Sequence, residues 1–206
     1  MKNDFWNQRF SEPGHAYGTE PNAFLASNKQ YLKPGMKALA VADGEGRNGV
    51  WLVGQGVDVL SVDASEVGLR KTRELAQGRG LTIHTELADL TRWAWPKNAF
   101  DIVAAIFIHF PPEHRARMHE KMRQTLKPGG VLIMEAFTPE QLKYKSGGPQ
   151  VKEMLYTAEM LRTDFRADEI LLLEERLTDL NEGPYHRGLA SVVRLVLRRN
   201  PSPQRL

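Results

Sequence analysis

The chain has 206 residues, of which 41% are hydrophobic and 26% charged, and its formal net charge is +3. These values are typical of one folded domain and leave too little chain for two large ones. The absence of cysteine excludes disulfides, cysteine-ligated zinc and cysteine nucleophiles, and we expect no metal site. No apolar run is long enough to span a membrane, and no basic stripe interleaved with aromatic residues indicates nucleic acid. We therefore expect a cytoplasmic protein without a membrane or nucleic-acid partner.

The first 35 residues are predicted to form a polar and aromatic cap segment. In it, Thr19 caps a helix that has Pro21 in its first turn. Residues 36–199 are predicted to form the main domain, and residues 200–206 a flexible tail. Strands are expected at 37–42, 58–62, 81–85, 100–107 and 131–136, and helices at 46–55, 65–76, from Pro111 onward and around 154–161.

Two further apolar runs, 169–177 and 189–197, are joined by a loop short enough for an antiparallel pair. The preceding alternation of strands and helices is typical of an α/β fold whose sheet is parallel and covered on both faces. The sequence therefore predicts a three-layer sandwich with an antiparallel strand inserted at one edge of the sheet.

A glycine-rich stretch, Gly44-Glu-Gly-Arg-Asn-Gly49, follows the first strand and opens a helix. Gly44 and Gly46 allow backbone to approach a ligand closely, and the helix directs free N–H groups at the same place. Asp63 ends the next strand, where its carboxylate can accept hydrogen bonds from both hydroxyls of a ribose. Together these features predict a nucleoside-containing cofactor at the carboxyl ends of the sheet.

Two cofactors fit this loop, a nicotinamide dinucleotide and S-adenosylmethionine. The chain is short for the extra strands and the substrate domain that a dinucleotide dehydrogenase needs. Asp89 follows the third predicted strand, where an acid can accept a hydrogen bond from an adenine amino group. With the closing antiparallel pair, these features favour S-adenosylmethionine.

The chain resembles class I S-adenosylmethionine-dependent methyltransferases over nearly its whole length, and within them the tellurite-resistance and thiopurine methyltransferase group. The resemblance implies a Rossmann-like sheet of seven mostly parallel strands with strand 7 antiparallel, and an N-terminal segment that folds over the cofactor. The segments that carry it are 6–10, 17–22, 44–48, 62–65 with 68–69, 88–90 and 126–130.

The chain departs from the family pattern at the end of the first strand. Ala40 stands where the family has an acid, and Ala42 where it has the first glycine of the loop. We expect alanine to be tolerated at 42 if its φ stays negative. Asp43 or Glu45 is available to take over the support that the missing acid gives the loop.

Several cofactor-binding candidates have a structural alternative. Asp63 is either the ribose ligand or a helix cap, and Asp89 either an adenine contact or a loop acid. Arg47 pairs either with a cofactor carboxylate or with a nearby acid such as Glu45. The residues expected to bind the cofactor are Trp6, Arg9, Tyr17, Gly18, Asp43, Gly44, Gly46, Arg47, Asn48, Asp63, Ala64, Ser65, Ala88, Asp89, Leu90 and Ile106.

In the cap segment, Arg9 is a second candidate for the cofactor carboxylate. Trp6 and Tyr17 either stack on the sulfonium through a cation–π contact or pack the cap. Candidate catalytic residues are His109, at the end of the fourth strand, and Tyr185 and His186, in the last loop. The alternative for His109 is a histidine bonded to backbone at a helix entry. The stretch 143–149 is either a mobile lid or an ordinary surface loop.

We therefore expect methyl transfer from S-adenosylmethionine to a small-molecule acceptor, which leaves S-adenosylhomocysteine. The protein mainly aligns acceptor, methyl group and sulfur, and a thiolate or an oxyanion of a soft element needs no strong base. Such acceptors are implied by the resemblance alone. The alternatives are an NAD-dependent oxidoreductase and a non-catalytic cofactor-binding or regulatory module, and the chain is expected to be a monomer or a homodimer.

Overall fold

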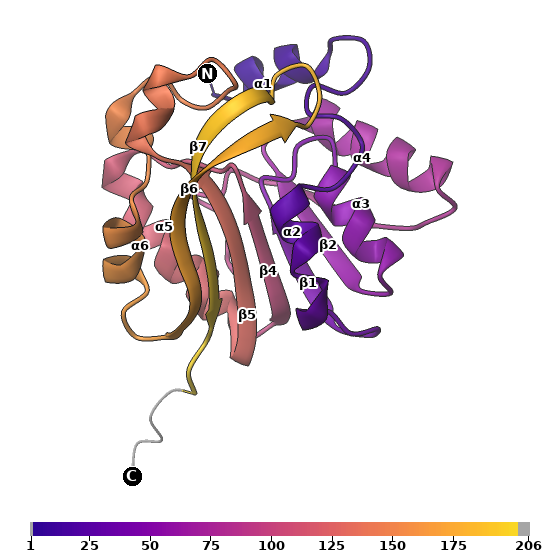
Figure 1. Cartoon of the computed structure of the whole chain (residues 1–206). Coiled ribbons are helices and arrows are strands. Elements are labelled where there is room, and N and C mark those ends of the chain that lie inside the picture. Colours follow the sequence, from indigo (N-terminus) through magenta and orange to yellow (C-terminus); the bar gives the residue numbers. More distant parts are fainter. Residues whose placement is uncertain (1, 202–206) are drawn as a thin grey trace.

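Seven strands form one sheet in the order β3-β2-β1-β4-β5-β7-β6 (Figure 1). The computed structural model describes residues 2–201. Within them β7 runs antiparallel to both of its neighbours, β5 and β6, and the pairs from β3 to β5 are parallel. The predicted fold is thereby confirmed. The strands are β1 (Lys37–Val41), β2 (Asp58–Asp63), β3 (His84–Leu87), β4 (Phe100–Ile106), β5 (Leu126–Phe137), β6 (Glu169–Asn181) and β7 (Arg187–Arg198).

Helices cover both faces of the sheet (Figure 1). One face packs against α2 (Ala23–Ser27), α3 (Arg47–Gly54) and α4 (Glu66–Gly78), and the other against α5 (Pro112–Thr125) and α6 (Ala158–Asp164). Helix α1 (Lys2–Phe10) contacts α4 and lies near the carboxyl end of the sheet. Short 3₁₀ helices span Lys29–Tyr31, Pro139–Lys143 and Lys152–Met154. No helix among residues 2–201 is long and apolar enough to cross a membrane.

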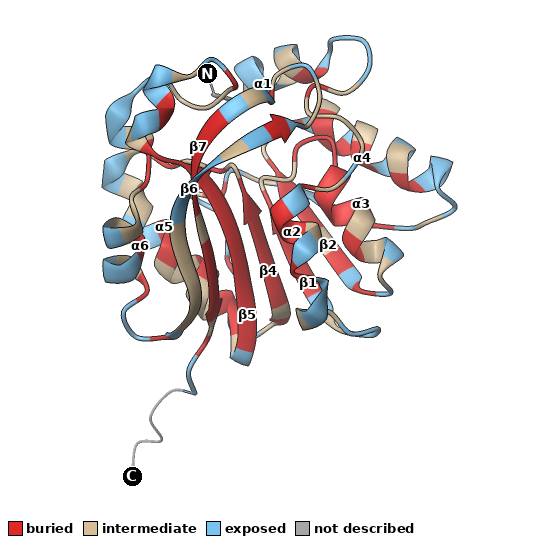
Figure 2. Ribbon diagram, viewed as in Figure 1, coloured by how far each residue is buried: buried red, intermediate tan, exposed pale blue. Residues whose placement is uncertain are grey.

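The central strands are buried on both faces, as their continuous apolar sequences require (Figure 2). In β4 every residue after Asp101 is buried. Because β2 pairs with one edge of β1 and β4 with the other, the chain reverses its direction across the sheet at β1. In open α/β sheets such a reversal leaves a crevice at the carboxyl ends of the strands, and this is where ligands bind.

Some predicted boundaries were wrong. The helix expected at Thr19 begins at Ala23, because the side chain of Asn22 accepts a hydrogen bond from the Leu25 N–H (2.9 Å) and caps it. The third strand begins at His84 instead of residue 81, and the helix expected around 154–161 is a 3₁₀ turn followed by α6. Helix α1 was not predicted. Of the predicted tail, residues 202–206 lie outside the described part of the chain.

The last two strands are longer than predicted, so the turn between them contains only residues 182–186. We call it the β6–β7 turn. It lies against residues 14–22, which we call the strap: Tyr185 N–H donates to the Ala16 carbonyl (3.2 Å). A Cβ on Gly183 would lie only 2.4 Å from the Gly18 nitrogen. The strap and the turn are therefore in direct backbone contact.

Candidate functional site

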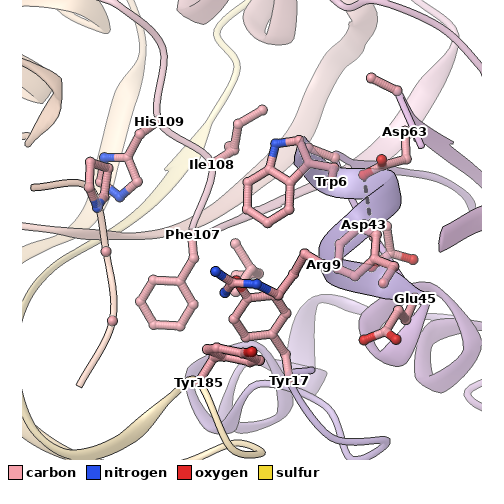
Figure 3. A pocket seen from close by; sticks show the side chains of 18 of the residues that line it. Trp6, Arg9, Tyr17, Asp43, Glu45, Asp63, Phe107, Ile108, His109 and Tyr185 are labelled. Carbon is pink, nitrogen blue, oxygen red and sulfur yellow. Dashed lines mark hydrogen bonds between the residues drawn. The ribbon is translucent and has the colours of Figure 1, made fainter. Parts of the chain in front are cut away.

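A pocket of about 690 Å³ opens at the carboxyl ends of the central strands (Figure 3). Its floor comes from the glycine loop and the ends of β2, β4 and β5. Helix α1, the strap, the β6–β7 turn and residues 147–149 form its other walls. Of the expected site residues, those that line it are Trp6, Arg9, Tyr17, Gly18, Asp43, Gly44, Arg47, Asn48, Asp63, Ala64, Asp89, Leu90, Ile106, His109, Tyr185 and His186.

Three of the expected cofactor residues lie outside the lining of this pocket. Gly46 has φ 86°, and a Cβ on it would meet the Thr72 side chain of α4, so this glycine serves helix packing. Ser65 caps α4 by accepting from the Gly68 N–H (3.0 Å). Ala88 is partly buried and packs against the core.

Asp63 lies at the end of β2, beside the glycine loop. Its two oxygens accept hydrogen bonds from the backbone N–H groups of Gly44 and Ser65, each at 2.8 Å. Burial raises the pKa of this carboxyl, against the effect of these backbone donors. Each oxygen keeps a lone pair, so the side chain is fixed in place while it still offers acceptors to a ligand. The ribose contact stays a prediction.

Asp43 occupies the space beneath the loop. Its Oδ2 accepts hydrogen bonds from Gly49 N–H (3.0 Å) and from the Ser61 hydroxyl (3.1 Å). Burial raises its pKa to about 7. It joins the loop, α3 and β2, which is the support that alanine at position 40 cannot give.

Glu45 has a different task. Its carboxylate accepts from the Ala16 N–H at 2.7 Å and from Lys71 Nζ at 2.8 Å. It therefore ties the strap to the glycine loop. Of the two acids available to replace the one missing at position 40, Asp43 takes over the support of the loop.

Two non-glycine residues of the pocket lining have a left-handed backbone. Ala42 has φ 51°, so the negative φ that would make alanine unstrained at this position is not found. Its N–H donates to the Val62 carbonyl (2.8 Å), which keeps the strand end in this conformation. Phe107, directly after β4, has φ 54°. Such a conformation is strained for a bulky residue and is found most often at functional sites.

Arg47 pairs with Glu182 of the β6–β7 turn (2.8 Å) and not with Glu45. Its other terminal nitrogen, Nη1, is buried without a hydrogen-bond partner. Burial would raise the pKa of Glu182, but its polar partners, Arg47 among them, outweigh burial and lower the pKa to about 2. A buried, unpaired guanidinium nitrogen beside a pocket fits an anionic group of a ligand. Asn48 holds the strap by accepting from the Asn22 N–H (2.9 Å).

The aromatic residues of the cap lie over the pocket (Figure 3). Trp6 stacks on Phe10 with 5.5 Å between the ring centres, and the Tyr17 ring lies 4.4 Å from that of His186. The guanidinium of Arg9 lies 3.8 Å above the ring of Tyr185. Packing and ligand stacking are therefore compatible for Trp6 and Tyr17.

His109 is bonded to backbone through both ring nitrogens. Phe137 N–H donates to Nε2 (3.1 Å), so Nδ1 carries the proton and donates to the Met154 carbonyl (2.8 Å). Burial lowers its pKa to about 4. The expected catalytic role therefore gives way to the alternative of a backbone-bonded histidine, because neither nitrogen is left for a substrate proton.

Tyr185 and His186 differ in their partners. The Tyr185 hydroxyl donates to Glu12 (2.7 Å), so it already has a partner outside the pocket. His186 is buried, and its Nδ1 has no hydrogen-bond partner, since the nearest Glu182 oxygen is 3.8 Å away. Of the three expected catalytic residues, His186 alone keeps a ring nitrogen or hydroxyl without a partner.

Some lining residues were not predicted as site residues: Phe5, Phe107, Ile108, Phe110, Phe137 and Met154. Glu182 was not predicted either, although it holds Arg47. Apolar runs in the sequence mark strands and helices and carry no sign of which residue at a strand end turns toward a pocket. The position of Phe107 at the end of a buried strand was the one available signal.

The central part of the chain is similar to known proteins. Residues 38–130 match the family described as "Methyltransferase domain". A ubiquinone/menaquinone biosynthesis C-methyltransferase UbiE of Bordetella parapertussis is 33% identical over 110 residues, which cover 52% of this chain and 43% of the relative. A sterol 24-C-methyltransferase ERG6B of Gibberella zeae is 30% identical over 135 residues, which cover 61% and 36%. The chain thus spans less than half the length of these relatives.

Solved structures share the fold over nearly the whole chain. A structure described as "Conversion of a Disulfide Bond into a Thioacetal Group during Echinomycin Biosynthesis" superposes with a TM-score of 0.78 at 19% identity, covering 97% of this chain and 92% of that one. TehB from Haemophilus influenzae has a TM-score of 0.72 at 19% identity, with 97% and 68% covered. Residues 38–130 are therefore similar to the methyltransferase domain family, and the chain shares the fold of solved structures described as S-adenosylmethionine-dependent methyltransferases.

Proposed function

We propose that the protein transfers a methyl group from S-adenosylmethionine to a small acceptor and releases S-adenosylhomocysteine. The observation that carries this proposal is the joint position of the glycine loop and Asp63 in one pocket. Asp63 would hold the ribose hydroxyls, because its two backbone donors fix both oxygens toward the pocket. Asp89 and Leu90, after β3, would contact the adenine.

The residues of this chain fit the other end of the cofactor as well. Arg47 offers a buried nitrogen without a partner, and Arg9 lies above the same pocket, so the two guanidinium groups would hold the carboxylate of the methionine part. The bound cofactor supplies an activated methyl group on a positively charged sulfur. Trp6 and Tyr17 would then face that charge and exclude water.

The acceptor belongs to the space beyond β4 and β5. We propose a thiol or a comparable soft nucleophile, since such groups react without a strong base. The support is the resemblance to the tellurite-resistance and thiopurine group and the fold shared with TehB. We also propose that the protein acts in the cytoplasm as a monomer or homodimer.

Isothermal titration calorimetry with S-adenosylhomocysteine and NADH tests the cofactor. We expect S-adenosylhomocysteine to bind with a micromolar Kd and NADH to give no heat of binding. Binding of NADH alone would refute the proposal and favour an oxidoreductase. If S-adenosylhomocysteine binds and a broad acceptor panel gives no turnover, the protein is a cofactor-binding module and the catalytic part of the proposal is wrong.

A further inference from the structure

The end of the pocket beside β4 and β5 has few groups that could hold an anion. Its walls are largely apolar or aromatic: Phe107, Ile108, Phe110, Pro111, Phe137, Pro149 and Met154. Three of the backbone N–H groups there already have acceptors. Phe107 donates to the Glu135 carbonyl (2.7 Å), Phe110 to the Tyr156 hydroxyl (2.7 Å) and Phe137 to His109 (3.1 Å). An oxyanion at this end would lose its water and gain little in return.

The charges around the pocket also disfavour an anionic acceptor. The acids of the lining are Asp43, Glu45, Asp63 and Asp89, and its guanidinium groups are those of Arg9 and Arg47. Arg47 is paired with Glu182, and Arg9 lies flat on Tyr185. The lining therefore suits a cationic cofactor and an uncharged acceptor.

His186 is the titratable group that reaches this apolar end with a nitrogen to spare. Its ring is packed between Tyr17 (4.4 Å between ring centres) and Phe107 (4.6 Å). Gly147 lies against the Nε2 edge of this ring, where a Cβ would come within 2.6 Å of Cδ2 and 3.1 Å of Nε2, so glycine leaves the room beside this nitrogen that a larger residue would fill. On the opposite edge, Nδ1 faces Glu182 at 3.8 Å.

From this geometry we infer that the acceptor is an uncharged, largely aromatic or aliphatic molecule with an O–H or S–H group, and that His186 Nε2 takes its proton. Glu182 is a positioning residue, because a shift of about 1 Å would let it accept from Nδ1–H. The acceptor's O–H or S–H bond gives its proton to Nε2, the freed electron pair forms the bond to the methyl carbon, and the carbon–sulfur pair returns to sulfur.

The charge state of His186 agrees with this role. Burial lowers the pKa of His186 although the neighbouring Glu182 opposes that effect, and the lowered pKa favours the neutral ring. The charged or titratable groups near it are Glu182, Arg47, Tyr17 and His109. A neutral imidazole with a carboxylate behind it is the arrangement expected of a general base.

This inference rests on the proposed function, and the experiment is arranged so that failure of the proposed function can be told apart from failure of the inference. S-adenosylhomocysteine is bound first and measured by calorimetry; if it does not bind, the proposed function fails. On the loaded protein, 2-naphthol, 2-naphthalenethiol and tellurite are added while the histidine ring signals are followed by NMR. We expect both aromatic probes, and not tellurite, to shift His186. A shift by tellurite alone, or no shift by either aromatic probe, would overturn the inference.

Turnover of the same probes with S-adenosylmethionine, followed by mass spectrometry, tests the proton transfer. Because the naphthol holds its proton more tightly than the thiol, His186→Gln should slow naphthol methylation about 100-fold and the thiol reaction much less. The same substitution should remove the fall in rate on the acid side of the pH profile. The Kd of S-adenosylhomocysteine, measured by calorimetry, should stay within about twofold of its value in the unchanged protein. The control is His84→Gln, an exposed histidine of β3. Equal slowing of both reactions, or unchanged rates, would refute the role of His186.

Glu182→Gln tests the positioning residue without turnover. Removing this negative charge should lower the titration midpoint of His186 measured by NMR, and the circular dichroism spectrum should stay unchanged. Since Glu182 also pairs with Arg47, a spectrum that changes shows only unfolding, and Glu182→Asp then provides the folded comparison. A midpoint that stays the same in a folded variant would show that Glu182 does not act on His186.

Discussion

Asp63 is the residue on which cofactor affinity should depend most. We expect Asp63→Ala to weaken S-adenosylhomocysteine binding by more than about 100-fold, because charge-assisted hydrogen bonds to two hydroxyls are lost, each of about 1.5–3 kcal/mol. Calorimetry measures the loss, and circular dichroism checks the fold. Asp63→Asn keeps one acceptor oxygen and should lose less. Unchanged affinity in a folded Asp63→Ala protein would remove this residue from the site.

The strained backbone of Ala42 predicts that its replacement by glycine stabilises the protein. Its φ of 51° costs an L-residue about 1–2 kcal/mol, which glycine avoids, while glycine loses about 0.4–1 kcal/mol more entropy on folding. Ala42→Gly should therefore raise the free energy of unfolding by about 0.5–1 kcal/mol in urea titrations. Ala40→Gly, in the regular part of β1, is the matched control and should destabilise. A destabilised Ala42→Gly protein would contradict the strain argument.

At the scale of elements, the strap and the β6–β7 turn depend on each other. A side chain at Gly183 would meet the Gly18 nitrogen at 2.4 Å and the Tyr17 carbonyl carbon at 2.6 Å. Gly183→Ala should therefore displace the strap, speed hydrogen exchange over residues 14–22 and weaken S-adenosylhomocysteine binding about tenfold, or about 1.4 kcal/mol.

Gly188→Ala is the control for this pair. Gly188 has a similarly positive φ of 102°, but a Cβ there has no atom within 4 Å, so it carries the backbone strain without the collision. In the Gly188→Ala protein we expect hydrogen exchange over the strap to be as slow as in the unchanged protein. If both variants loosen the strap equally, backbone strain of alanine at a positive φ is the cause, and not the collision with the strap.

The elements show what a sequence can predict. The alternation of buried strands and helices was enough for the confirmed fold, because β4 has an unbroken apolar run that only a covered strand needs. The start of α2 was missed because Thr19 and Asn22 are both good caps, and only tertiary contacts decide between them. The strap consists of turns and bends where a helix was expected from Thr19 onward, and Asn22 at its end bonds to Asn48 and Glu182 far along the chain.

At the scale of the whole molecule, the buried side chains of Asp43 and His109 have opposite effects on how stability depends on pH. Burial raises the pKa of Asp43 to about 7, so the folded protein holds that proton more tightly, and stability falls as pH rises from about 4 to about 7. Burial lowers the pKa of His109 to about 4, so the unfolded chain takes that proton first. Stability therefore falls as pH drops from about 6.5 to about 4.

Single substitutions should reveal how each of these two groups contributes to the pH dependence of the free energy of unfolding. Denaturant titrations between pH 4.5 and 7 give the free energy of unfolding at each pH. We expect Asp43→Asn to make the slope of this free energy against pH more positive and His109→Gln to make it more negative, each by at most about 1.4 kcal/mol per pH unit. Parallel curves for all three proteins would show that neither group is buried as described.

The sequence was enough to predict those site residues that directly follow or end a predicted strand and also have a side chain or backbone suited to the cofactor. The glycine loop and Asp63 follow strands, so the sequence placed them at one edge of the sheet. Arg47 could not be assigned, because its partner Glu182 is 135 residues away and only the closing turn brings them together. The role expected of His109 depended on a ring nitrogen that backbone atoms of Phe137 and Met154 occupy.

The contact between the strap and the β6–β7 turn also orders events during synthesis. Translation runs from the amino end, so residues 14–22 leave the ribosome long before residues 182–186 have been made. Until then Asn22 lacks its bond to Glu182, and Arg47 lacks its counter-ion. The strap therefore cannot take its final position over the pocket until the last hairpin of the chain has been made.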